Sequence, residues 1–244
     1  FEMELTHLLI YQMGAFNSPV WFNCGLWHEY GISGTGVNYY WDQKTDTITE
    51  INNGYEHPQC SACFIQSVKD DILSIFDLVK NEAKLFKYGS GTGTNFSSLR
   101  GRGEKLSGGG TSSGVMSFLE VLDRGAASIK SGGTTRRAAK MVILDIDHPQ
   151  IVDFILWKVR EEKKAQILIA SGEYPSDYNG EAYKTVSGQN SNNSVRVTDA
   201  FMDAFLNDQE WYTISRTSGE KMNTYQAREI MEMIAQSAWS CADP

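Results

Sequence analysis

Hydrophobic positions along the chain follow two rhythms, one typical of strands and one typical of helices. Residues 63–68 and 141–146 are short, mostly apolar runs, and the second is unbroken, as in a strand that is buried on both faces. Residues 72–86 instead carry apolar side chains at helical spacing, with Gly89 ending the predicted helix. The pattern therefore predicts a strand that leads into a helix, and a buried strand further on.

The same reasoning predicts the remaining elements. Residues 36–54 indicate two strands about a polar turn, a surface hairpin. Helices are predicted within 1–14, 115–130, 150–164, 199–207 and 224–239, and strands at 194–197 and 210–215. The expected helix caps are Asp70 or Asp71, Ser112 or Ser113, Asp147 with Pro149, and Thr198. Residues 171–193 are polar, with Gly, Ser and Asn throughout, and indicate an excursion of the chain away from the regular helices and strands. Because strands repeatedly lead into helices, the predicted class is α/β, with a mainly parallel sheet or barrel.

Composition narrows the function classes. Of the 244 residues 41% are apolar, enough for a core, and no run of apolar residues is long enough to span a membrane. The net charge of −8 argues against a nucleic-acid partner. Four cysteines are too few for a secreted disulfide scaffold, so we expect a reducing cytoplasm. The chain starts without Met inside a predicted helix and stops without a tail, so we expect a piece of a longer protein.

Two glycine-rich stretches, 89–114 and 131–139, hold a large share of the cations. Arg100, Arg102 and Lys105 lie in the first; Arg136, Arg137 and Lys140 lie in or beside the second. Neither the phosphate-binding sequence of ATPases nor a dinucleotide fingerprint is present. Glycine-rich backbone and arginine forks suit small anionic ligands such as phosphates. The alternative is a pair of solvated surface loops, although loops as long as the first are usually functional or disordered.

The spacing C-x-x-C occurs once, at Cys60 and Cys63, with His57 close by. Three interpretations are open: part of a zinc site, a local dithiol, or packing. Zinc needs four ligands, and Cys24 and Cys241 stand apart, so a zinc module is the weakest hypothesis. A redox motif would place its first cysteine at a helix N-terminus, but Cys63 begins a predicted strand. The spacing alone favours neither chemistry, and no metal ligand is assigned.

Five stretches occur in one order along the chain: FNSPVWFN at 16–23, HPQCSACFIQSVKDDILSIFD at 57–77, KYGSGTGTNFSSLRGRGE at 87–104, GGGTSSGVMSFLEVLD at 108–123 and SGGTTRRAAKMVILDIDHP at 131–149. Together they resemble the adenosylcobalamin-dependent (class II) ribonucleotide reductases. The resemblance implies part of a ten-stranded α/β barrel, with residues 1–244 as the N-terminal portion of the catalytic domain and 27–57 as a hairpin insertion. It also implies a radical reduction of ribonucleotides to deoxyribonucleotides, started by adenosylcobalamin and completed by a cysteine pair that becomes a disulfide.

The resemblance implies roles for particular residues. Cys63 matches one member of the reducing pair, whose partner lies outside this chain, and Cys60 is then a bystander. The positions that match substrate-binding ones are Ser18, Ala62, Gly91 and Arg136, with Thr135 as the alternative to Arg136. The positions that match effector-binding ones are Asp70, Arg100, Ser107, Gly132 and Gly133. Residues 98–110 correspond to the first specificity loop and 132–139 to the second.

Partners follow from the same resemblance. They are a ribonucleotide substrate, a deoxynucleoside triphosphate or ATP effector, a thioredoxin-like or other dithiol reductant, and a second copy of the chain that packs through helices 70–86 and 115–130. The radical cysteine and the second reducing cysteine belong to a missing C-terminal half, so the fragment alone should not turn over. The alternatives are a piece of a class I large subunit and a non-catalytic module that binds deoxynucleoside triphosphates.

Overall fold

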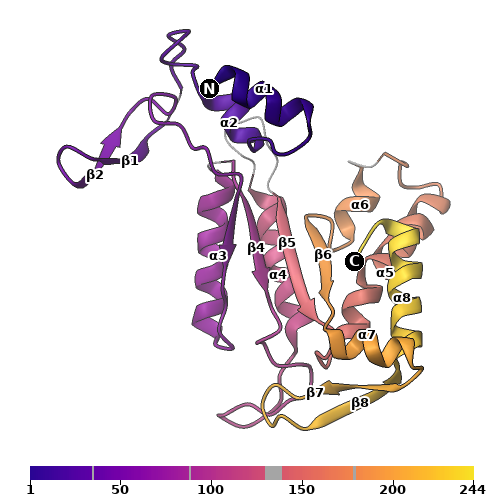
Figure 1. The fold of residues 1–244 in the computed structure, drawn as a ribbon. Helices are drawn as coiled ribbons and strands as arrows, with labels where there is room; N and C mark the ends of the chain where they lie inside the picture. The colour runs from indigo at the N-terminus through magenta and orange to yellow at the C-terminus, as the bar shows by residue number, and fades with distance from the viewer. Residues whose placement is uncertain (35, 88, 130–138, 178–179) are drawn as a thin grey trace. The chain divides into compact units, whose positions relative to one another are not determined.

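The computed structural model describes residues 1–34, 36–87, 89–129, 139–177 and 180–244 (Figure 1). The elements in chain order are α1 Glu2–Ile10, α2 Ser18–Asn23, β1 Asn38–Asp42, β2 Thr47–Ile51, β3 Cys63–Gln66, α3 Ile72–Lys87, β4 Gly91–Asn95, α4 Val115–Ser128, β5 Lys140–Asp145, α5 Ile151–Ala170, α6 Glu181–Thr185, β6 Ser191–Arg196, α7 Asp199–Leu206, β7 Glu210–Ile214, β8 Lys221–Gln226 and α8 Ala227–Cys241. They fall into two units, one formed by Phe1–Phe64 and the other by the described residues from Ile65 to Pro244.

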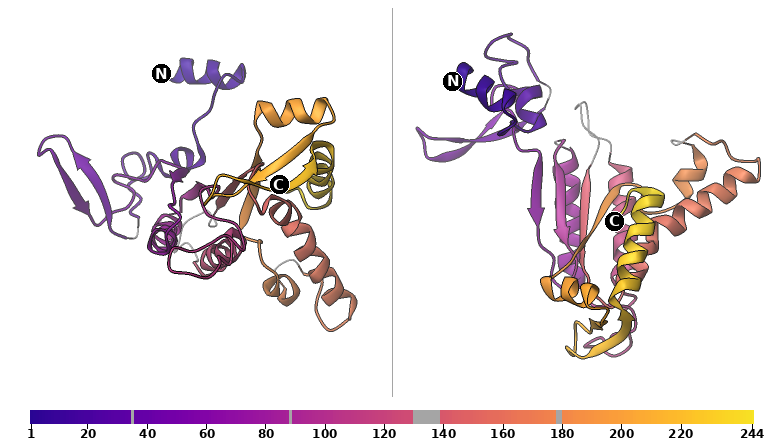
Figure 2. Two further views of the ribbon diagram at one scale, coloured as in Figure 1. Left: turned by 90° about the horizontal axis from the view of Figure 1, so that it is seen from below. Right: turned by 45° about the vertical axis from the view of Figure 1, so that its right-hand side comes forward.

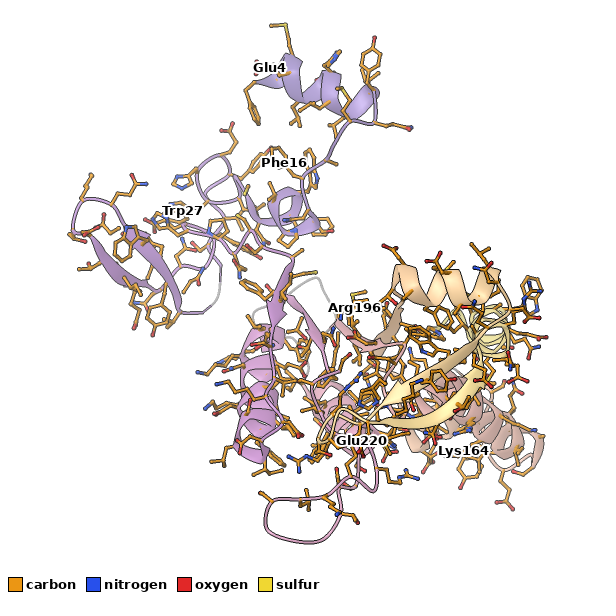
Figure 3. The ribbon with its side chains drawn as sticks, turned by 60° about the horizontal axis from the view of Figure 1, so that its bottom comes forward. Glu4, Phe16, Trp27, Lys164, Arg196 and Glu220 are labelled. Carbon is orange, nitrogen blue, oxygen red and sulfur yellow. The ribbon has the colours of Figure 1, made fainter. Side chains whose placement is uncertain are left out.

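The first unit contains α1, α2 and the β1–β2 hairpin. The hairpin is antiparallel, with Asn38 opposite Ile51 and Asp42 opposite Thr47. Alternation of half-buried and exposed side chains along β1 matches the period of a strand that is covered on one face. The hairpin predicted from the sequence is therefore confirmed, and Figure 3 shows the side chains of this unit, with Phe16 and Trp27 on either side of α2 along the chain.

The second unit is built on a four-stranded sheet in the order β3-β4-β5-β6. β4 and β5 run parallel with Thr92 opposite Lys140, and β5 and β6 run parallel with Lys140 opposite Ser191. Each of these strands is joined to the next through a helical connection, so the order in the sheet follows the order in the chain. That is the way the wall of an α/β barrel is built, and the predicted class is confirmed.

Helices α3 and α4 lie side by side along the strands, as the two views of Figure 2 show. Their buried apolar positions are those of the predicted helical stripe, for example Ile75, Leu78 and Phe86 on α3. The core continues into β5 and α5; its largest fully buried side chains include Phe96, Leu119, Leu122, Leu144, Ile146, Phe154, Ile155 and Phe201. Each such side chain stabilises the fold by about 1.5–3 kcal/mol of apolar burial. None of the described helices has the length and apolarity that crossing a bilayer requires.

Three sequence-based expectations are wrong. β4 lies inside the stretch that was expected to be a loop, because its sequence GTGTN has no large apolar side chain and hides its strand character. β8 occupies the start of the predicted last helix, and pairs antiparallel with β7, with Trp211 opposite Tyr225. β6 begins inside the predicted excursion, and α6 lies wholly within it. Pairing with a neighbouring strand decided the cases of β4, β6 and β8, and the local pattern does not encode it.

The expectation that β5 is buried on both faces is also wrong. Lys140, Val142 and Leu144 are buried, whereas Met141 between them is 42% exposed. Asp145 accepts hydrogen bonds from Asn95 and Arg196 at the ends of the neighbouring strands. The sheet therefore has one face covered by helices and one more open, more polar face.

Candidate functional site

The predicted site residues of the first unit are Ser18, Ala62 and Cys63. Cys63 is the first residue of β3 and its side chain is exposed. Ala62 before it is half-buried. Ser18 begins α2 and is exposed, while Pro19 next to it is buried and fixes the start of the helix. The thiol of Cys63 is thus open to a reagent or partner, as a cysteine that changes oxidation state requires.

The C-x-x-C spacing does not form a local dithiol. From residue 60 to 66 the side chains alternate between half-buried and exposed, so Cys60 and Cys63 lie on opposite sides of the segment. Cys60 contacts Cys24 instead, with the Sγ atoms 3.3 Å apart. Cys24, which was expected to stand apart, therefore has a thiol partner in Cys60.

In the second unit the structure brings two predicted effector residues together. The Nε of Arg100 donates to the Oδ2 of Asp70 at 2.5 Å, and its backbone N–H donates to Oδ1 at 3.3 Å. The Nη1 of Arg100 donates to the carbonyl of Lys105 at 2.8 Å. The guanidinium is thus held in one orientation from two sides, at the start of the first glycine-rich loop. A fixed guanidinium of this kind suits recognition of a phosphate.

The loop from 98 to 110 is closed at its base. An isolated bridge joins Lys105 and Thr111, and the N–H of Ser112 donates to the carbonyl of Glu104 at 2.8 Å. Ser107 lies at the exposed tip. Gly91 is buried at the start of β4. The tip is therefore available to a ligand, while the base is built into the fold.

Glu104 ties this loop to the β7–β8 hairpin, whose turn carries Glu220 (Figure 3). Its buried carboxylate accepts from the N–H of Gly101 at 2.6 Å, the hydroxyl of Ser215 at 2.6 Å, and both the N–H and the hydroxyl of Thr217. Burial alone raises the pKa of Glu104, but these hydrogen bonds outweigh it and the pKa is lowered. The carboxylate is thus a charged anchor between two segments more than a hundred residues apart.

Gln150 and Gly114 complete the base of the loop. The Oε1 of Gln150 accepts from the N–H of Arg102 at 3.2 Å. Gly114 has φ +88°, and a Cβ there would collide with the Gln150 amide and the Arg102 backbone. Only glycine allows the two segments to approach this closely. Gly114, and neither of the serines expected, is the N-cap residue of α4.

His148 supports the backbone directly before Arg100. The ring is fully buried; its Nδ1 accepts from the N–H of Gln150 at 3.1 Å, so its Nε2 is the donor to the carbonyl of Leu99 at 2.8 Å. Burial lowers the pKa of His148 to about 4. His148 is therefore a core residue with both ring nitrogens hydrogen-bonded.

This lowered pKa predicts acid destabilisation. The pKa of an unfolded histidine is near 6.5, so between pH 6.5 and about 4 the unfolded state binds a proton that the folded state does not. The free energy of unfolding should fall by about 3 kcal/mol over this range and be flat above pH 7.5 as far as this group is concerned. Urea unfolding at a series of pH values should show that His148→Gln removes this slope. The exposed His28→Gln should retain it; an unchanged slope in His148→Gln would refute the assignment.

Lys140 was expected among the ligand-facing cations, and that expectation is wrong. Its Nζ lies 2.8 Å from the Oε2 of Glu82, and the two side chains are 1% and 3% exposed. Thr92 donates to the other oxygen of Glu82 at 3.2 Å. Burial raises the pKa of Glu82 and lowers that of Lys140, while their mutual attraction opposes both shifts. The pair fixes α3 to β5 at Lys140, directly after the second glycine-rich stretch.

The other residues predicted for the site lie outside the described residues. They are Gly132, Gly133 and Arg136, together with the alternative Thr135. Conversely, the supporting residues Glu104, His148, Glu82 and Asp147 were not found from the sequence. Asp147 binds Arg216 of the β7–β8 turn through both oxygens, at 2.6 and 3.4 Å. The sequence feature that could have pointed to these supporting residues is a charged residue inside an otherwise apolar or glycine-rich stretch.

Metal chemistry finds no support in the part of the chain that the structure describes. No three His, Cys, Asp or Glu side chains gather there as a metal site would require. His57, a member of the zinc hypothesis, stacks on Tyr40 with ring centroids 3.6 Å apart. His28 lies within hydrogen-bond distance of the Glu56 carbonyl.

Comparison with known proteins gives one family. The family model described as "Ribonucleotide reductase, barrel domain" matches residues 61–244. A "Vitamin B12-dependent ribonucleotide reductase" of Rhodopirellula baltica is 50% identical over 246 residues, which cover 100% of this chain and 24% of the relative. Its counterpart in Agrobacterium fabrum is 44% identical over 315 residues, covering 100% of this chain and 25% of the relative.

A more distant relative shares most of the same region. The "Vitamin B12-dependent ribonucleoside-diphosphate reductase" of Thermoplasma acidophilum is 37% identical over 204 residues, covering 83% of this chain and 23% of the relative. The chain thus spans about a quarter of the length of the curated relatives it matches.

Proposed function

Because the chain belongs to the ribonucleotide reductase family, with residues 61–244 in its barrel domain, we propose that the full-length protein reduces ribonucleotides to deoxyribonucleotides with adenosylcobalamin. The observation that carries the proposal is similarity along the whole chain to relatives named for vitamin B12 dependence, at 44% and 50% identity. The dependence on cobalamin favours class II over class I. Residues 1–244 would form the N-terminal portion of the catalytic barrel, with 27–57 as an insertion.

Within this proposal Cys63 supplies one of the two reducing thiols. Its exposure at the start of β3 leaves the sulfur free to pair with a cysteine from another part of the protein. Reduction of one ribonucleotide takes two electrons, which the two thiols provide as they become a disulfide. An external dithiol, such as a thioredoxin-like protein, then restores them by exchange. Because these thiols must stay reducible between turnovers, a cytoplasmic location is part of the proposal.

Ser18, Ala62, Gly91 and Arg136 are proposed for the substrate side. Ser18 and Ala62 lie in the first unit and Gly91 in the second. Ala62 offers no side-chain hydrogen bond, so any contact with a phosphate there is made by the backbone. Glycine at 91 leaves the β4 backbone free of a side chain at its first residue.

The hollow described on the second unit does not fit cobalamin. α4, α5 and residues 185–187 surround an open hollow of about 570 Å³, a volume suited to a drug-sized ligand, and charged side chains such as Glu120, Arg124 and Lys164 line it. Cobalamin, whose corrin ring carries a rim of amide side chains, is far larger than this hollow. No residue of this chain is therefore assigned to cobalamin.

For regulation, we propose that the first loop binds a deoxynucleoside triphosphate or ATP as effector. Asp70 and Arg100 form its fixed part, Ser107 lies on the exposed tip, and Gly132 and Gly133 belong to the second loop. A second copy of the chain would pack on α3 and α4. α3 exposes Leu73 at 72% and Phe76 at 51%, three residues apart on one face of the helix.

Replacement of Arg100 should weaken binding of the effector. A hydrogen bond to a charged group contributes about 1.5–3 kcal/mol, so Arg100→Ala should raise the effector Kd roughly 10- to 150-fold in calorimetry. The matched control is Arg102→Ala, an exposed arginine two residues along the same loop. Equal affinities of Arg100→Ala and the unchanged protein would contradict the assignment.

The activity is tested with the full-length protein, a ribonucleotide, a dithiol and adenosylcobalamin, with no second subunit added. Formation of deoxyribonucleotide is the expected result. Activity that requires a metal-containing second subunit would favour class I instead. Effector binding without any reduction would favour the non-catalytic module.

A further inference from the structure

Cys24 and Cys60 form a thiol pair that the proposed reaction does not use. Their Sγ atoms lie 3.3 Å apart although the residues are 36 positions apart in sequence. Both belong to the first unit, so the contact is internal to one compact body. Cys24 is exposed and Cys60 is half-buried.

Side chains on both sides of Cys24 hold the segment that carries Cys60. The Nδ2 of Asn23 donates to the carbonyl of Gln59 at 3.0 Å, and His28 lies 3.2 Å from the carbonyl of Glu56. Asn38 donates to the carbonyl of His57 at 2.7 Å. These three anchors hold residues 56–59 against α2, the turn after it and the start of β1, and the contact between the two sulfurs follows from that packing.

We propose that Cys24 and Cys60 are a second redox-active dithiol, separate from Cys63, which closes to a disulfide when the protein meets a disulfide oxidant such as oxidised glutathione. An S–S bond of about 2.05 Å requires the sulfurs to approach by little more than 1 Å. The sulfur that Cys60 contacts is that of Cys24, whereas Cys63 is exposed at the start of β3. The proposal stands independently of the reductase activity.

The Cys24–Cys60 disulfide forms through two thiol–disulfide exchanges. The exposed thiol of Cys24, as thiolate, attacks the oxidant and releases one thiol; Cys60, after losing its proton, attacks the Cys24 sulfur and releases the second. The two protons of the cysteines end on the two released glutathione thiols; the oxidant gains two electrons, and Cys24 and Cys60 lose them. Burial and the neighbouring Cys24 raise the pKa of Cys60 to about 11, so the second exchange should be slow at pH 7 and faster at alkaline pH.

The disulfide would clip the end of α2 to the segment that leads into β3. The closed loop contains the whole β1–β2 hairpin and ends three residues before Cys63. Oxidation of Cys24 and Cys60 would therefore constrain the backbone segment that carries Cys63, the proposed reducing cysteine.

Peptide mapping tests the proposal. The full-length protein is incubated in glutathione buffers from reducing to oxidising, quenched in acid, alkylated and cut with trypsin. Cleavage after Lys44 and Lys69 places Cys24 on one peptide, and Cys60 with Cys63 on the next. The expected product under oxidising conditions is the peptide pair cross-linked through Cys24 and Cys60, whatever the oxidation state of Cys63, and this cross-link should disappear in reducing buffer.

Three variants separate the outcomes. Cys24→Ser and Cys60→Ser should abolish the cross-link, and Cys63→Ser should leave it unchanged. A Cys60–Cys63 disulfide within one peptide, or glutathione adducts without any cross-link to Cys24, would overturn the proposal. Because the cross-link is detected in the unchanged protein, its assignment does not depend on the folding of the variants.

Discussion

Cys63→Ser is expected to abolish sustained reduction by the full-length protein. A serine cannot be oxidised to a disulfide, so the two electrons needed in each turnover are no longer available. The multiple-turnover rate with a dithiol reductant should fall by at least a factor of about 100, in line with the loss of one essential group. Effector affinity should not change, because Asp70 and Arg100 belong to the second unit and Cys63 to the first.

The matched control for this prediction is Cys60→Ser. Cys60 lies three residues away but faces the other side of the segment and contacts Cys24. In reducing buffer this variant should retain a rate close to that of the unchanged protein. Full activity of Cys63→Ser over many turnovers would show that the assignment of Cys63 is wrong.

Lys140→Met should produce the largest loss of stability. The change leaves the carboxylate of Glu82 buried without its cation, and breaking a buried ion pair in this way costs about 3–5 kcal/mol. Loss of the cation should raise the pKa of Glu82 further above its already raised value. The deficit should therefore shrink at acidic pH, where the folded state takes up a proton on Glu82. Urea unfolding at pH 7.5 and pH 5 measures both effects.

Two controls separate burial from charge in this result. Arg160→Met removes an exposed pair with Asp153, whose side chains are 54% and 40% exposed, and should cost less than about 1 kcal/mol. The double variant Glu82→Leu with Lys140→Met removes both charges and should recover most of the lost stability. If Lys140→Met were as mild as Arg160→Met, the buried pair would not stabilise the fold as described.

Helices and buried strands were predictable where the pattern is local. The stripe of Ile75 and Phe86 along α3 follows from spacing alone, and Thr198 caps α7 as expected, accepting from the N–H of Phe201. β4 and β8 were not predictable, because neither has an apolar pattern of its own. Pairing with β5 and β7, which lie far along the chain or across a turn, makes them strands.

The residues of the candidate site also divide into predictable and unpredictable ones. Asp70 and Arg100 were predicted as one group from resemblance, and the structure brings them into contact. Lys140 was misassigned because Glu82, its partner, is 58 residues away. Glu104 and His148 were not predicted, for a related reason. Each forms a hydrogen bond with a residue distant in sequence, and the neighbouring sequence does not indicate that bond.

Thiol labelling after a single turnover tests the central claim, that this chain supplies one member of the reducing pair, most directly. The full-length protein is fully reduced, freed of dithiol, given a ribonucleotide, effector and adenosylcobalamin, and then alkylated. The account predicts deoxyribonucleotide at no more than about one per chain, with Cys63 protected from alkylation until dithiol is restored and Cys60 alkylated throughout. Deoxyribonucleotide formed while Cys63 remains fully open to alkylation would contradict it.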